Sequence, residues 1–222
     1  MANFSGSYLK LQRAREHLSN LKQRVEDLRK PDIHFVPVKR EGTRLSFAPE
    51  RQPGSHYPWA NILVGEFSQQ LRSSLNYIAV EVGFVDSGTR HRSAQFPIDD
   101  FPEDFNRHRK TYLRGVKLSH IADFERLQPY KGCDWTKRLR EISNDDKHWD
   151  IVPVTASFSA EFSGVDPKTN ERANIFTADT VKVEYGFAGT ITFANGSPVI
   201  ETLEILQSQV AHTLDEFKAM FA

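Results

Sequence analysis

The 222-residue sequence predicts an α+β fold: a helical bundle of about five helices with an N-terminal β-hairpin and a C-terminal antiparallel meander. Three observations indicate this class. Apolar residues recur every three or four positions near the N-terminus and again from Trp59 to Val85, as on the buried face of a helix. Residues 151–194 instead alternate between apolar and polar types, as strands with one wet face do. Helical spacing then returns from Pro198 onward.

The order of these patterns favours a single domain over residues 1–222, because the last helix returns after the sheet and can close the bundle. We expect helices at about 7–30, 59–85, 101–116, 119–128, 134–148 and 198–221. Strands are expected at about 33–48 and 151–194.

The first helix carries one narrow apolar seam on an otherwise charged surface. The seam contains Tyr8, Leu11, Ala14, Leu18, Leu21, Val25 and Leu28. Pro31 ends this helix, because proline has no amide hydrogen and its ring clashes with the preceding turn. Such a seam packs on the rest of the chain or pairs with another helix of its kind. We favour packing within the chain and keep assembly with itself or another protein through this helix as the alternative.

A hairpin is expected over residues 33–48, where DIHFVPV and TRLSFAP flank a turn at Glu41 and Gly42. The long helix that follows has an apolar stripe and an opposite polar side. The stripe contains Leu63, Phe67, Leu71, Leu75, Ile78 and Val82. Gln69, Arg72 and Asn76 fall together on the other side, for which a solvated face is the simplest interpretation.

Shorter helices come next. Asp100 can cap the helix that begins near Pro102, and Asp134 can cap the helix that carries Trp135 and Leu139 on one side. The run RHRK at 107–110 is typical of a solvated helix face, and nothing in the sequence says which other elements it adjoins.

The later strands alternate in two runs, residues 152–162 and 181–193. Their links are too short for parallel crossovers, so an antiparallel meander is expected. A turn at Asn195 and Gly196 leads to the last helix, which Ser197 and Pro198 begin.

Composition narrows the classes of function. Lys plus Arg and Asp plus Glu are 29 each, so no net field draws the whole protein onto nucleic acid or an anionic membrane. A secretory signal and a stretch of ~20 apolar residues are both absent, so we expect a cytoplasmic protein without a membrane partner. Cys133 is the single cysteine and has no disulfide partner within the chain. Phosphate-loop and dinucleotide motifs are absent, and we expect no cofactor and no metal site.

The stretch Leu127–Trp149 gathers the most ionisable and amide side chains. If its helix continues to the end of the stretch, Arg140, Asn144 and His148 are successive neighbours on one face. Cations beside an imidazole can hold a phosphodiester and move protons near neutral pH. These three are therefore the candidate catalytic residues.

The competing interpretation of the polar groups is structural. It assigns Arg72, Asn76, Asp146 and Lys147 to a polar cluster that knits the core together. We prefer this interpretation, because ion pairs near helix ends are commoner than active sites.

Four segments, GEFSQQLRSSLNYIAVEV, QFPIDDF, LQPY and LREISNDDKHW, resemble in this order a family of uncharacterised bacterial proteins that also occurs in mobile elements. The second helix of that family reads close to HNLRSALDH, and a later helix ends close to NxDKHR. Matching positions include Leu71, Arg72, Ser73, Leu75, Asn144, Asp146, Lys147 and His148. Gln69, Gln70, Asn76 and Tyr77 depart from the pattern and remove titratable groups. The resemblance implies no particular activity.

Two functions are therefore expected in order of preference. The first is a non-enzymatic bacterial protein that acts through protein–protein assembly. The alternative is a metal-independent ribonuclease of a defence or toxin system, whose helical bundle with a late Arg and His is similar to HEPN ribonucleases. Only under that alternative is RNA a partner.

Overall fold

The computed structural model describes residues 2–28, 35–41, 44–49, 58–148, 154–165, 168–169, 171–173 and 182–221. The chain forms two compact units. The helical unit comprises Met1–Leu21, Pro58–Pro153 and Val199–Ala222, and the strand unit comprises Lys22–Tyr57 and Val154–Pro198. That residues 1–222 make a single domain stays a prediction.

Six α-helices occur among the described residues, and each overlaps a range expected from the sequence. They are α1 (Ser5–Leu28), α2 (Pro58–Ser87), α3 (Pro102–Tyr112), α4 (Leu118–Glu125), α5 (Asp134–His148) and α6 (Val199–Met220). A short 3-10 helix, η1 (Pro129–Lys131), lies between α4 and α5. No helix in the described ranges is both long enough and apolar enough to cross a membrane.

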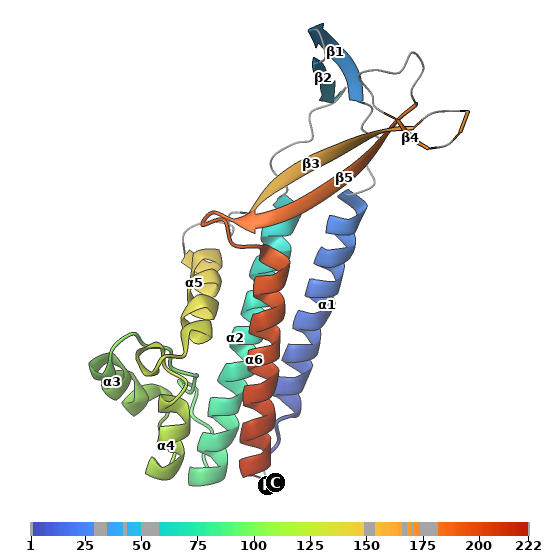
Figure 1. Ribbon diagram of the computed structural model, residues 1–222. Coiled ribbons are helices and arrows are strands. Elements are labelled where there is room, and N and C mark those ends of the chain that lie inside the picture. Colours follow the sequence, from blue (N-terminus) through green and yellow to red (C-terminus); the bar gives the residue numbers. More distant parts are fainter. Residues whose placement is uncertain are drawn as a thin grey trace. The chain divides into compact units, whose positions relative to one another are not determined.

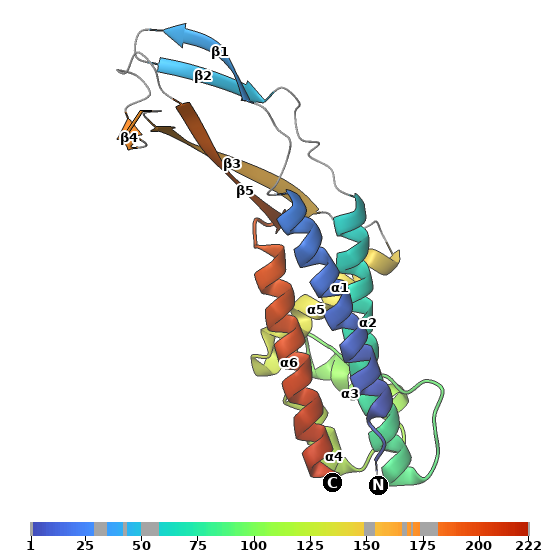
Figure 2. The same ribbon diagram turned by 90° about the vertical axis from the view of Figure 1, so that its right-hand side faces the viewer.

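Three long helices, α1, α2 and α6, lie side by side in the helical unit (Figures 1 and 2). Their apolar stripes face one another and are buried, as the spacing of three and four residues requires. Ser74 Oγ donates to the carbonyl of Ser7 (2.9 Å) between α2 and α1. Tyr8 Oη donates to Asp215 Oδ1 (2.6 Å) between α1 and α6. Helix α2 also contacts α5, so it is the central helix of the unit.

The seam of α1 is buried within one chain, since Leu11, Ala14, Leu18 and Leu21 are at most 3% exposed. A second chain could use this seam only by displacing the helices that cover it. Assembly with another chain through the N-terminal helix stays a prediction.

The segment between α2 and α3 corrects the expected start of α3. Phe101 is the N-cap residue of α3 and makes no side-chain cap hydrogen bond, and Pro102 is the first helical residue. Asp100 does not cap the helix, because its carboxylate pairs with Arg140 instead (2.7 Å). After α3, Gly115 adopts a φ of 87° and turns the chain towards α4.

The strand unit contains two sheets. Strands β1 (Phe35–Glu41) and β2 (Arg44–Pro49) pair antiparallel with each other, with an irregularity between Pro37 and Lys39. Strands β3 (Val154–Val165), β4 (Arg172–Ala173) and β5 (Lys182–Phe193) form the second sheet in the order β4-β3-β5. The register sets apolar residue types opposite each other, as in Ala156↔Ile191 and Phe162↔Tyr185.

The expected fold class is therefore wrong. The described part of the chain is mainly helical, with six α-helices in place of about five, and the helices form a compact unit of their own. The C-terminal strands do not make a meander, because β4 and β5 both flank β3 instead of lying side by side. Alternation of apolar and polar residues indicates that a segment is extended, but it does not indicate which other segment it pairs with.

Candidate functional site

Polar side chains from three helices converge on the backbone of residues 96–100, just before α3. Arg72 Nη2 donates to the carbonyl of Phe96 (2.7 Å), and Asn76 Oδ1 accepts from the Phe96 amide (3.0 Å). Arg140 Nη1 donates to the carbonyl of Ile98 (3.0 Å), while its Nη2 pairs with Asp100 (2.7 Å). These contacts hold an irregular segment whose backbone groups have no strand to pair with.

Gln128, the N-cap residue of η1, adds further contacts to the same segment, and we call these contacts together the clamp. Its side chain is fully buried and makes three hydrogen bonds. Oε1 accepts from the Asp99 amide (2.8 Å), and Nε2 donates to the carbonyls of Pro97 (2.9 Å) and Phe124 (2.8 Å). Every donor and acceptor on this amide except one lone pair is therefore used.

The charges in the clamp lie close together. Burial, and then repulsion from Arg140, lower the pKa of Arg72 to about 10, and the carboxylate of Asp99 opposes this shift. Arg72 thus stays protonated at neutral pH. Asp99 Oδ1 also pairs with His108 Nδ1 (2.7 Å), which links α3 to the clamp.

Of the three candidate catalytic residues, the structure describes the side chains of Arg140 and Asn144, so whether the three come together stays a prediction. Arg140 is engaged by Ile98 and Asp100. Asn144 is exposed on α5. The backbone of α5 is helical through His148, but that side chain lies outside the described residues.

The structure describes two members of the expected polar cluster. Arg72 and Asn76 both hold the Phe96 backbone, as a structural role requires. The side chains of Asp146 and Lys147 lie outside the described residues, so their place in the cluster stays a prediction. The clamp also contains Asp99, His108 and Gln128, which sequence reasoning missed. A lone buried Gln, for example, produces no periodic pattern in the sequence.

Hydrogen bonds also hold the turn between α4 and α5. Thr136 Oγ1 lies 2.9 Å from the carbonyl oxygen of Leu127 and 2.7 Å from that of Cys133, and the two carbonyls share its single hydroxyl hydrogen. Gly132 ends η1 with a φ of 85°, a conformation that favours glycine. Together with Gln128, these contacts make residues 127–136 a rigid turn.

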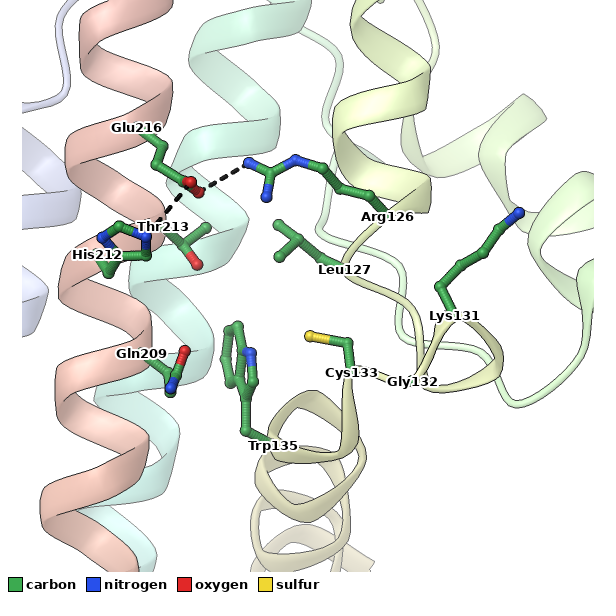
Figure 3. A pocket seen from close by; sticks show the side chains of 10 residues that line it. All are labelled: Arg126, Leu127, Lys131, Gly132, Cys133, Trp135, Gln209, His212, Thr213 and Glu216. Atoms are coloured by element: carbon green, nitrogen blue, oxygen red, sulfur yellow. Dashed lines mark hydrogen bonds and ion pairs between the residues drawn. The ribbon is translucent and has the colours of Figure 1, made fainter.

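One pocket opens between this turn and α6, and we call it the α6 pocket (Figure 3). Its volume is about 350 Å³. Leu127, Cys133 and Trp135 face the hollow from the turn, and Gln209, His212 and Thr213 line it from α6.

The α6 pocket has a charged rim. Glu216 Oε2 accepts from Arg126 Nη2 (2.8 Å), and its Oε1 lies 3.4 Å from His212 Nε2. Burial raises the pKa of the Cys133 thiol, against smaller opposing effects of Thr136 and Trp135. The thiol is therefore protonated at neutral pH and is a poor nucleophile.

A second pocket borders η1 through Pro129 and Tyr130, and we call it the Phe101 pocket. Its volume is also about 350 Å³, and its lining includes Asp100, Phe101, Tyr130 and Lys137. Phe101 is 63% exposed, although it is a large apolar residue. Because Asp100 belongs to the clamp, the clamp also fixes one wall of this pocket.

Comparisons with protein-family models, curated proteins and solved structures find no match to this chain. The resemblance drawn from the four sequence segments therefore stays a prediction, and the function has to be argued from the geometry.

Proposed function

We propose that the protein is non-enzymatic and acts through protein–protein assembly, with a partner docked on the two pockets that border η1. We call this the docking surface and define it by Phe101, Arg126, Tyr130, Trp135 and His212. The observation that carries the proposal is that two pockets of similar volume both border the turn that contains η1.

The first support is that the polar residues of the clamp have a structural role, because they hold a backbone segment in place. Arg72, Arg140 and Gln128 each bond to the backbone of the same segment. That segment forms a wall of the Phe101 pocket, so the pocket is held in shape before anything binds. A preformed site loses less conformational entropy on binding than a flexible one.

The second support is the chemistry of the lining. Trp, Tyr and Arg dominate the binding energy of protein interfaces, and Trp135, Tyr130 and Arg126 all lie on the docking surface. A volume of about 350 Å³ lies near the lower end for small-molecule sites, and it suits one large anchor side chain. The partner would insert one anchor side chain into each pocket.

Photo-crosslinking tests this proposal. A benzophenone amino acid at Lys131, whose side chain is about half exposed at the rim of the α6 pocket, is compared with one at Leu9, which is 66% exposed on α1. We expect a discrete adduct from position 131 in cells that produce the protein, and none from position 9. The adduct should disappear with Trp135→Ala, and circular dichroism must show that this variant is folded. An adduct of twice the monomer mass from the purified protein would identify the partner as a second copy.

Two results would overturn the proposal. One is equal adducts at both positions, or adducts that persist with Trp135→Ala. The other is cleavage of RNA by the purified protein without added metal, if Arg140→Gln or His148→Ala abolishes it at an unchanged melting temperature. That second result would establish the ribonuclease alternative.

A further inference from the structure

Basic residues are segregated in one part of this otherwise balanced chain. Residues 105–120 contain five Lys or Arg and two His, without any Asp or Glu. Residues 88–95 add two Arg and one His, again without an acidic residue. The whole chain has 29 basic and 29 acidic residues, so these two segments carry a local excess of positive charge.

The fold brings the two segments together. Ser93 Oγ donates to the carbonyl of Thr111 (3.1 Å), and the Gln95 amide donates to the carbonyl of Tyr112 (3.2 Å). At Gly115, an added Cβ would lie 3.2 Å from His91 Nε2. The loop after α2 thus lies against the C-terminal end of α3.

Carboxylates neutralise only some of these cations. Arg90 pairs with Glu81 (2.6 Å) and Arg107 pairs with Asp104 (2.6 Å). Within the described residues, Arg92, Lys110 and Arg114 have no carboxylate within ion-pair distance, and all three are exposed. We call Arg92, Lys110 and Arg114 the basic surface.

We propose that the basic surface binds the phosphodiester backbone of a single-stranded nucleic acid. Two of its three cations are Arg, whose planar guanidinium matches a phosphate bidentately and is weakly hydrated. The carboxylate of Asp99 holds His108 by Nδ1, and the imidazole stacks on Tyr112 with ring centroids 5.3 Å apart. His108 is 33% exposed, so this pair offers an aromatic platform beside the cations, which is the combination that single-strand sites use.

The expected salt dependence of binding follows from counterion release. Each phosphate contact makes the slope of log K against log salt steeper by about 0.7 for a single strand, so three contacts give a slope of about −2.1. Binding should then weaken about 18-fold between 50 and 200 mM salt. Removing two contacts should make the slope shallower by about 1.4.

Fluorescence anisotropy with a labelled single-stranded RNA of about 20 nucleotides, and with DNA of the same sequence, measures this slope. The test variant is Arg92→Gln with Arg114→Gln. The matched control is Arg13→Gln with Arg15→Gln, which removes two exposed charges from α1. We expect the test variant to lose at least tenfold in affinity at 50 mM salt, and the control to bind like the unmodified protein.

Three outcomes would refute the proposal. The first is no salt-dependent binding of either oligonucleotide, and the second is an equal loss in test and control variants. The third is binding to vesicles of anionic phosphatidylserine, lost with the test variant, when neither oligonucleotide binds. That last outcome would assign the surface to a membrane.

Discussion

Replacing Gln128 by Glu exchanges one NH2 group for an oxygen of nearly the same size, so the resulting change in stability reports hydrogen bonding and charge more than packing. In the protein, Nε2 donates to the carbonyls of Pro97 and Phe124. In the variant a carboxylate oxygen would face both carbonyl oxygens. The bond from the Asp99 amide to Oε1 would remain.

The magnitude follows from the burial of this side chain, which is 0% exposed. Two buried carbonyls lose their donor at about 1–3 kcal/mol each, and a buried carboxylate without a cation adds to this. We therefore expect the free energy of unfolding to fall by about 3–5 kcal/mol at pH 7. Burial and the facing carbonyls should raise the pKa of the new carboxyl. Stability should then recover partly as the pH falls towards 5, because the protonated acid can again donate one bond.

Urea unfolding followed by far-UV circular dichroism at pH 7 and pH 5 is a suitable assay, since the signal comes mainly from the helices. Gln209→Glu makes the same chemical change at an exposed position of α6 and serves as the control. Equal urea midpoints for the two variants at pH 7 would show that Gln128 does not hold the clamp.

Three further predictions rest on single groups. Burial lowers the pKa of His17 from 6.5, so the folded state resists protonation more than the unfolded chain. Stability should fall as the pH drops below about 6.5, and His17→Gln should flatten that part of a urea-midpoint profile. The Cys133 thiol, whose pKa burial raises, should react with iodoacetamide more slowly than free cysteine at pH 7.5, as mass spectrometry can measure. Gly115→Ala should cost more stability in urea than Gly88→Ala. Both have positive φ, but only at the former would the Cβ clash, 2.7 Å from Ser87 Oγ, and equal losses would contradict this.

Helix positions could be predicted from the sequence because burial imposes a period. Leu71, Leu75 and Ile78 had to share one side of α2 whatever covered them, and all are fully buried. Strand pairing could not be predicted in the same way. The alternation in β3 and β5 is compatible with several strand orders, and only the contacts between strands select β4-β3-β5.

The candidate site was less accessible to sequence reasoning. Arg72 and Asn76 were identified as one polar group because they lie four positions apart on a helix, on the same side. Their partner is the backbone of Phe96, and the sequence does not indicate which backbone group a side chain will bond to. The pockets were missed for a similar reason, since α6 and the rigid turn meet only in the folded chain.

The hydrogen bond between Tyr8 and Asp215 joins residues 207 positions apart, and the helical unit is built from three separate stretches of chain. Synthesis on the ribosome delivers α1 first and α6 last of the described helices. The apolar stripe of α2 therefore cannot obtain its contacts with α6 until nearly all of the described chain has been made. During that interval the nascent chain would expose side chains that are later buried, and exposed apolar surface of this kind favours aggregation of incompletely folded chains.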